Sequence, residues 1–226
     1  MESNKIVRIE NINYKIKEGE KTRNILKDVN YSFLNNSITV ISGPSGSGKT
    51  TLLYAIAGLL DDVDGEIYID NFQINKLTKK KKDEFRLNNI SMVFQNLNLF
   101  SFMNVEDNIL VPFYIKDKKI DEDVHRKISE YLQLMNLGQI QNKSIQSLSG
   151  GEQQRVAIIR AIIDNPKVIL CDEPTASLDK NNVVIFMETL LKIKKSTEST
   201  IIIVTHDERV TKYGENKISM VDGSIE

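Results

Sequence analysis

A glycine-rich loop between an apolar strand and a helix constrains this chain more than any other feature. Residues 43–50 read Gly-Pro-Ser-Gly-Ser-Gly-Lys-Thr and fit the pattern G-x-x-x-x-G-K-S/T. A β-branched run precedes the loop at 38–41, and a helical pattern follows it at 51–59. Glycines let backbone N–H groups wrap a phosphate, and the following helix N-terminus adds partial positive charge. The sequence therefore predicts an α/β fold with a phosphate site at this loop.

The loop also supplies two side chains with expected roles. Lys49 would bring a full positive charge to the β- and γ-phosphates, and the Thr50 hydroxyl can ligate Mg²⁺. The predicted nucleotide-binding residues of this segment are Gly43, Pro44, Ser45, Gly46, Ser47, Gly48, Lys49, Thr50 and Thr51. The motif alone indicates a nucleoside triphosphate and no more, because kinases, GTPases and many motors share it.

A second candidate site lies where an apolar strand ends in two acids. Residues 168–171 are apolar, and Asp172 and Glu173 follow them. Two adjacent carboxylates at a strand end are costly unless they meet a cation or water. We expect Asp172 to hold Mg²⁺ and Glu173 to act as general base for an attacking water. Cys171, inside the strand, is expected to be a small buried hydrophobe.

Composition narrows the function classes. Of the 226 residues 40% are hydrophobic, which is enough for a substantial core. A formal net charge of -1 argues against a dedicated nucleic-acid binder, which usually carries a basic domain. The apolar runs are far shorter than the roughly 20 residues of a membrane span, and the N-terminus has no apolar signal segment. We therefore expect a soluble intracellular protein whose membrane part, if any, comes from a partner.

Periodicity predicts alternating strands and helices. Short β-branched runs indicate strands at 38–41, 67–69, 90–93, 168–171 and 201–205. Helical patterns cover 151–163 and 180–195, and Asp121 is a plausible N-cap for a third helix. The alternation implies an α/β fold with a largely parallel core sheet.

Two stretches depart from this alternation. Residues 6–70 are rich in strands and predict an antiparallel layer beside the core, whereas 95–148 predict a helical insertion. The Asp-Gly turn at 222–223 predicts a small C-terminal hairpin. We expect one domain, in which 1–94 and 156–226 form the α/β core with its β layer and 95–155 form a helical subdomain.

A third motif lies between the glycine-rich loop and the pair of acids. Residues 148–155 read Leu-Ser-Gly-Gly-Glu-Gln-Gln-Arg and resemble the LSGGQ-type signature of ABC ATPases, with Glu152 where many members have Gln. All the motifs occur in the family's order, so the chain resembles an ABC nucleotide-binding domain from about residue 6 to 225. The resemblance implies a RecA-like P-loop NTPase core and an ATPase that uses ATP and Mg²⁺. It also assigns 157–161 to a strand that partners the phosphate loop.

Further roles follow from the resemblance alone. Tyr14 resembles the aromatic that stacks on adenine, Gln95 the glutamine that touches Mg²⁺ and water, and His206 the histidine that contacts the γ-phosphate. The family implies that two head-to-tail chains sandwich ATP in a homodimer. The residues that would act on the other chain's nucleotide are Ser149, Gly150, Gly151, Glu152 and, in the loop 177–179, Asp179.

Three weaker segments indicate a branch of the family. The insertion 15–24, the segment 95–113 and the ending Asp222-Gly223 resemble the branch that energises lipoprotein release, macrolide efflux and peptide-antibiotic export. That resemblance implies a separate permease with four transmembrane helices and a location at the cytoplasmic face of the membrane. The transported substance is not encoded here, because the permease contacts it.

Other function classes fit less well. A soluble ABC ATPase acting on chromosomes or ribosomes usually has long coiled coils or two cassettes, and this chain shows neither. A P-loop kinase or GTPase would leave the signature unexplained, and no Asn-Lys-x-Asp motif for guanine is present. A non-catalytic binding subunit would not need Glu173 and His206.

Overall fold

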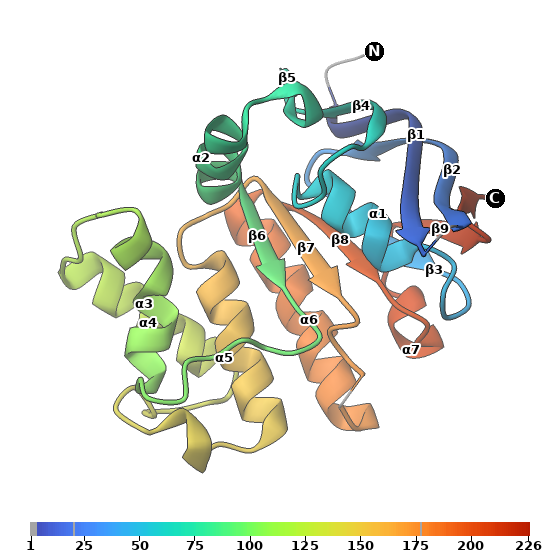
Figure 1. Ribbon diagram of the computed structural model, residues 1–226. Coiled ribbons are helices and arrows are strands. Elements are labelled where there is room, and N and C mark those ends of the chain that lie inside the picture. The colour runs from blue at the N-terminus through green and yellow to red at the C-terminus, as the bar shows by residue number, and fades with distance from the viewer. Residues whose placement is uncertain (1–3, 20, 177) are drawn as a thin grey trace.

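The computed structural model describes residues 4–19, 21–176 and 178–226 and contains two sheets. The larger sheet has six strands in the order β10-β9-β3-β8-β7-β6 (Figure 1). Its strands are β3 (Ile38–Ser42), β6 (Ile90–Val93), β7 (Val168–Asp172), β8 (Thr200–Val204), β9 (Asn216–Val221) and β10 (Ser224–Ile225). The pairs from β9 to β6 are parallel, and only β10 runs antiparallel to its neighbour. The predicted parallel core and C-terminal hairpin are confirmed.

The smaller sheet is antiparallel and has the order β2-β1-β4-β5. It consists of β1 (Lys5–Glu18), β2 (Lys21–Leu34), β4 (Asp64–Ile69) and β5 (Phe72–Gln73). Helix α1 (Lys49–Ile56) lies between this β layer and the core sheet (Figure 1). The predicted antiparallel layer is confirmed.

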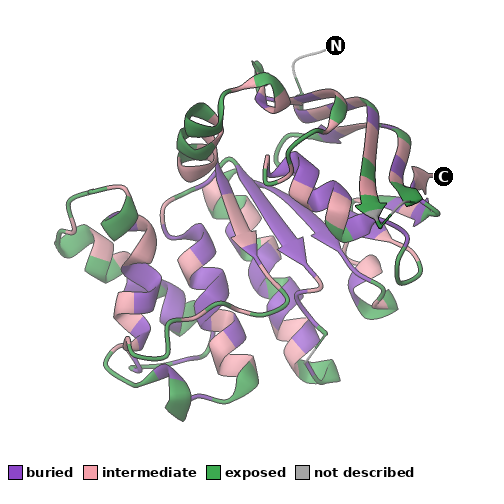
Figure 2. Cartoon of the chain, in the orientation of Figure 1, coloured by how far each residue is buried: buried purple, intermediate pink, exposed green. Residues whose placement is uncertain are grey.

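The central strands β7 and β8 are buried along their whole length, as strands of parallel sheets usually are (Figure 2). Along β7, Ile169 and Cys171 pack in one hydrophobic cluster, while Val168 and Leu170 pack in the other. The first cluster includes the apolar faces of α5 (Gly150–Ile162) and α6 (Lys180–Thr197), and the second contains α1 and the β layer. The two-residue period of a strand thus divides each strand between the two halves of the core.

The segment predicted to be helical contains α3 (Val105–Ile115) and α4 (Glu122–Leu134), and it forms no strand among its described residues beyond an isolated bridge. The carboxylate of Asp121 accepts a hydrogen bond from the Val124 amide, which confirms this residue as the N-cap of α4. The remaining helices are α2 (Lys79–Asn89), α7 (Glu208–Thr211) and the 3₁₀ turns Ile74–Lys76 and Ile145–Ser147.

One predicted strand is wrong. Residues 157–161, assigned to a strand by the family resemblance, lie inside α5. The reason is local, since a capping box at Ser149 and Glu152 starts the helix and buried apolar residues continue at helical spacing. The predicted boundary between the helical subdomain and the core, after residue 155, falls inside helix α5. The division of the chain into these two parts stays a prediction.

No helix among the described residues combines the length and the apolarity needed to cross a bilayer.

Candidate functional site

The glycine-rich loop joins β3 to α1 in a backbone conformation that requires glycine. Gly43, Gly46 and Gly48 have positive φ angles of 147°, 78° and 99°. A Cβ atom at Gly43 would lie 2.1 Å from the carbonyl oxygen of Met220, so the loop passes directly against β9. Helix α1 begins at Lys49, two residues earlier than predicted, and its free N–H groups therefore follow the loop at once.

The Lys49 ammonium is fixed over this loop. Its Nζ donates hydrogen bonds of 2.8 Å to the carbonyl oxygens of both Gly43 and Pro44, and Ser47 Oγ lies at 3.5 Å. The residue is only 6% exposed, and burial lowers the pKa of the amine from its usual value. The nearby carboxylates of Glu173 and Asp172 oppose that shift. A cation on a glycine-lined backbone loop is suited to bind phosphate.

Asp172 ends β7 next to the start of α1. Its Oδ1 accepts a 2.8 Å hydrogen bond from the Thr50 hydroxyl, and burial raises the pKa of the carboxyl. The Thr50 hydroxyl, the Asp172 carboxylate and the Gln95 amide are oxygen donors of the type that Mg²⁺ prefers. Mg²⁺ is commonly held by one or two protein carboxylates together with phosphate and water, so these residues fit the ion.

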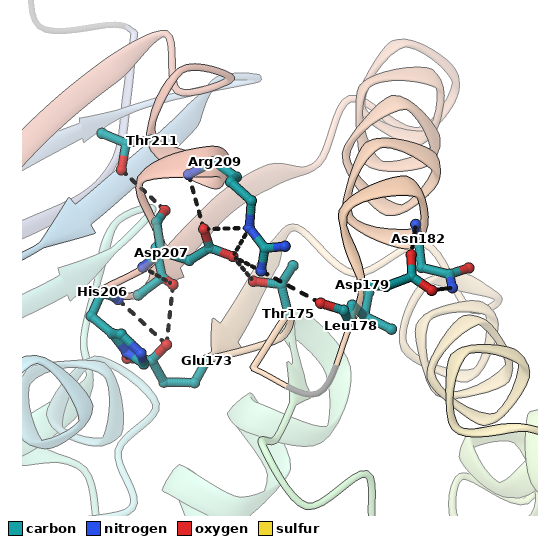
Figure 3. Close-up of polar contacts among 10 residues, drawn as sticks. Glu173, Thr175, Leu178, Asp179, Asn182, His206, Asp207, Arg209 and Thr211 are labelled. Atoms are coloured by element: carbon teal, nitrogen blue, oxygen red, sulfur yellow. Dashed lines mark hydrogen bonds and ion pairs between the residues drawn. The ribbon is translucent and has the colours of Figure 1, made fainter.

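Glu173 is held by contacts from the end of β8 (Figure 3). Its Oε1 lies 2.9 Å from Nδ1 of His206, and its Oε2 accepts from the Thr205 hydroxyl at 3.1 Å. Its φ of 46° is unusual for a residue with a side chain, and its amide donates to the Val204 carbonyl at 3.0 Å. Such a conformation costs on the order of 1–3 kcal/mol and is common at functional sites. Of the three predicted catalytic residues, Glu173, His206 and Lys49, the first two thus lie in contact.

A network that the sequence did not predict continues from this pair (Figure 3). The Asp207 carboxylate accepts hydrogen bonds from Thr175 Oγ1 at 3.2 Å and from Arg209 Nη2 at 2.8 Å. Arg209 also donates to the Leu178 carbonyl at 3.4 Å, so it ties the segment after His206 to the segment before α6. The Arg209 hydrogen bonds are the main reason that the pKa of Asp207 lies below its usual value. The sequence signal that could have predicted this network is the acid and the arginine that follow His206, namely Asp207 and Arg209.

A cavity of about 630 Å³ brings most of the predicted site together. Its lining residues are Arg23, Ile25, Ser45, Gly46, Gly48, Lys49, Thr50, Thr51, Gln95, Glu173 and His206. Arg23 and Ile25 belong to β2 and were not predicted. Part of the phosphate loop, Glu173, His206 and Gln95 therefore face one cavity, whereas the predicted site residues Gly43, Pro44, Ser47 and Asp172 are not among its lining residues.

The predicted adenine contact, Tyr14, belongs to β1. It is not among the residues that line the cavity; its side chain is half-buried and packs against the hydrophobic cluster of the β layer. Its cross-strand partner is Leu26, which is 1% exposed.

The signature residues form the capped start of α5. Ser149 Oγ donates to Glu152 Oε2 at 2.7 Å, and the Ser149 amide donates to the same oxygen at 2.8 Å. These bonds lower the pKa of Glu152. The site predicted at Ser149, Gly150, Gly151 and Glu152 does not line the cavity of its own chain.

Asp179 caps the N-terminus of α6 and accepts from the Asn182 amide. It is likewise absent from the residues that line the cavity. Ser177, in the predicted loop 177–179, lies outside the described residues.

Comparisons with known proteins agree with this site. The sequence model of the family "ABC transporter" matches residues 26–176. The uncharacterised ABC transporter ATP-binding protein MJ0796 of Methanocaldococcus jannaschii is 36% identical over 98% of this chain and 95% of its own length. A dimeric structure of MJ0796 bound to ADP and Pi has a TM-score of 0.89 at 35% identity, over 98% of this chain and 97% of that one.

Two further relatives belong to named systems. The methionine import ATP-binding protein MetN of Vibrio vulnificus is 36% identical over 96% of this chain, which spans 63% of MetN. The structure of cbiO1 from Clostridium perfringens, part of the transporter complex cbiONQ, has a TM-score of 0.87 at 31% identity, over 99% of this chain and 88% of that one. With a phosphate loop, an acid pair and a capped signature helix in one fold, the chain belongs to the ABC transporter family, as one of its ATP-binding ATPase subunits.

Proposed function

We propose that this chain binds Mg-ATP in the cavity beside the phosphate loop and hydrolyses it to drive a separate membrane permease. One observation carries the proposal: Glu173 and His206 touch each other at 2.9 Å and line the same cavity as Lys49. A water beside the γ-phosphate would then meet a general base and a hydrogen-bonding imidazole together.

Each residue has a physical role in this mechanism. Lys49 binds the β- and γ-phosphate oxygens with a charge that is already positioned over the loop. Glu173 takes a proton from the attacking water, and the contacts from Thr205 and His206 fix the direction of its carboxylate. The Mg²⁺ ion, held by Thr50, Asp172 and Gln95, would neutralise charge on the phosphates when bound.

We propose a homodimer because the signature residues do not line the cavity of their own chain. Ser149 is exposed and Gly151 is half-buried at the start of α5, and neither lines the cavity of its own chain. A helix N-terminus with free N–H groups binds anions, so this tip suits the γ-phosphate held by a second copy. The dimeric structure of MJ0796 supports this arrangement. We propose that ATP closes a homodimer and that hydrolysis opens it.

A broad apolar cleft is the proposed docking site for the permease. The cleft has a volume of about 1030 Å³ and lies between α2, the end of β6 and α3. Phe100 and Ile115 line it and are 41% and 63% exposed, which is unusual for large apolar side chains. Phe94 and Asn98 also line it, on either side of Gln95, so a partner there would contact the segment that carries a nucleotide-site residue. This contact would hold the chain at the cytoplasmic face of the membrane.

A second part of the proposal concerns the direction of transport. The segments 15–24 and 95–113 and the Asp222-Gly223 ending support export or extraction of a peptide, lipoprotein or drug, with a permease of four transmembrane helices. The identity with MetN favours a second candidate, import of a small solute. Purification of the complex from detergent-solubilised membranes, followed by sequencing of the permease, separates the two.

Three variants test hydrolysis and the composite site. Glu173→Gln removes the base and keeps the hydrogen-bonding shape, so it should bind ATP and hydrolyse it at least a hundredfold more slowly. Action of the signature in trans is tested by mixing Lys49→Ala with Ser149→Arg chains, each inactive alone. Mixed dimers contain one intact composite site and should regain part of the activity; no recovery would contradict a shared site. Full turnover by Glu173→Gln would remove Glu173 as the base.

A further inference from the structure

We propose that the start of α2, together with the neighbouring Phe72, binds a membrane surface of anionic lipid headgroups directly. This basic patch consists of Lys79, Lys80, Lys81 and Phe72, and all four residues are exposed. The proposal goes beyond the proposed function, in which the permease alone holds the chain at the membrane. Lipid binding by the basic patch requires neither nucleotide nor permease.

Helix α2 lies at the edge of the fold and buries none of its residues (Figure 2). It stands beside the start of β6, the last strand of the core sheet (Figure 1). Five basic and two acidic residues give α2 a net charge of +3 within a chain of net charge -1. The positive charge is therefore a local feature of this helix and does not follow from the overall composition.

The charges at the start of α2 are unfavourable for the helix itself. Residues 79–82 are all lysine, and the first turn contains no acidic residue. The free N–H groups of a first turn carry partial positive charge, so lysines there destabilise the helix. Thr78 precedes them as N-cap, but its side chain accepts no capping hydrogen bond. Sequences depart from such local preferences mainly at functional sites, which favours an external anionic partner for these lysines.

Neighbouring acids neutralise only part of the basic patch. The acids in contact with α2 are each paired with one cation, namely Asp61 with Lys82, Asp83 with Arg86 and Glu84 with Lys80. The pair of Lys80 and Glu84 is separated by 4.0 Å and is largely exposed, so it contributes little. Lys79 and Lys81 form no ion pair among the described contacts. Their ammonium groups are available to lipid phosphates and carboxylates.

Phe72 gives the basic patch an apolar contact. Its side chain is 54% exposed, and its ring centroid lies 5.4 Å from that of Phe85 on α2. Lys81 and Phe85 are four residues apart and therefore lie on one side of the helix. Lysines beside an exposed aromatic ring suit a membrane interface, because the ammonium meets the headgroups while the ring enters the boundary below them.

The basic patch also borders the cleft proposed for the permease. Lys79 and Lys80 line that cleft together with Leu87 of the same helix. A permease lies within a bilayer, so a chain docked in the cleft would hold the start of α2 close to the headgroups. This placement rests on the proposed function, and the two contacts would then strengthen each other as linked binding sites do.

Co-sedimentation with vesicles tests the proposal on the full chain without nucleotide. The vesicles contain phosphatidylcholine alone or with about 30% phosphatidylserine. We expect binding to the anionic vesicles only, and its loss at about 1 M salt, where the Debye length is about 3 Å. Replacing Lys79 and Lys81 with Gln should weaken binding roughly twenty-five-fold, because each lysine near such a surface contributes roughly fivefold.

A matched control is available on α6, which packs against the opposite hydrophobic cluster from Phe85. Lys192 and Lys195 are exposed there and form no ion pair among the described contacts. Replacing both with Gln removes the same charge and should change binding less than about twofold, because the lost charges lie far from the lipid. The α2 variant should melt at the same temperature as the unaltered chain or higher, since unfavourable charges leave the helix start.

Three results would overturn the proposal. The unaltered chain could fail to bind anionic vesicles, it could bind phosphatidylcholine vesicles equally well, or the α2 and α6 variants could lose equal affinity. The first would exclude a lipid site, the second would make the contact apolar, and the third would make it a response to net charge. None of them would bear on ATP hydrolysis, because the assay contains no nucleotide.

Discussion

Replacing Asn108 with alanine should destabilise the protein strongly without touching the nucleotide cavity. Asn108 is 0% exposed on α3, and its side chain holds the preceding loop by hydrogen bonds. Its Oδ1 accepts from the Phe100 amide at 2.8 Å, and the two hydrogens of its Nδ2 serve the carbonyls of Asn104 at 2.9 Å and Phe100 at 3.0 Å, with the Met103 carbonyl farther away at 3.4 Å. These bonds position Phe100, which lines the apolar cleft.

The magnitude follows from those bonds. Each contributes a net of about 0.5–1.5 kcal/mol, and the longest contributes least, so the total loss is about 3 kcal/mol. For a chain of this size, about 2–4 °C of melting temperature is lost per kcal/mol, which predicts a drop of about 6–12 °C. Urea unfolding followed by circular dichroism measures the free energy, and ADP titration should show unchanged affinity in the folded variant.

A matched control is available on α2. Asn88 is exposed, and its side chain bonds only the Glu84 carbonyl of the same helix among the described contacts, at 2.9 Å. Asn88→Ala should change the free energy of unfolding by less than about 0.5 kcal/mol, because alanine is the better helix former. A loss below about 1 kcal/mol in Asn108→Ala would refute the idea that this buried amide fixes the loop.

Three further predictions concern the site and its surroundings. Gly43→Ala should lower nucleotide affinity at least tenfold or prevent folding, because its Cβ would lie 2.1 Å from the Met220 carbonyl oxygen; Gly46→Ala, with no atom within 4 Å of its Cβ, should do less harm in the same titration. Cys171 should stay unlabelled by a thiol reagent at pH 8 until the protein is unfolded, because burial raises the pKa of its thiol to about 12; rapid labelling of folded protein would contradict this. Glu152→Gln keeps an oxygen that can cap α5 and removes a negative charge from the helix tip, so ATP-dependent dimerisation should tighten roughly twofold to fivefold in sedimentation experiments.

Much of the fold was predictable because its signals are local. The strand, glycine loop and helix around Lys49 follow from conformational preferences that neighbouring residues determine. The cap at Asp121 and the apolar strands ending at Asp172 are of the same kind. The wrong strand at 157–161 came from the family resemblance, whereas periodicity in the same residues favoured the helix that is present.

The parts that sequence could not predict depend on register and on distant contacts. The face on which Tyr14 lies is set by bulges in the β1–β2 pair, and one extra residue such as Ile25 changes which side chains share a face. The link from Asp207 through Arg209 to the Leu178 carbonyl joins segments about 30 residues apart. Such pairings exist only once the core sheet has brought β7 and β8 together.

The most direct test is the mass of the Glu173→Gln variant in solution, measured by light scattering with Mg-ATP and with Mg-ADP. Slow hydrolysis should trap the closed form, so we predict twice the chain mass with ATP and the single-chain mass with ADP. A double variant that carries both Glu173→Gln and Ser149→Arg should remain a single chain with ATP, because the helix tip can no longer approach the γ-phosphate. A single-chain mass with ATP, or a dimer that the Ser149→Arg change leaves intact, would contradict an ATP molecule clamped between two copies.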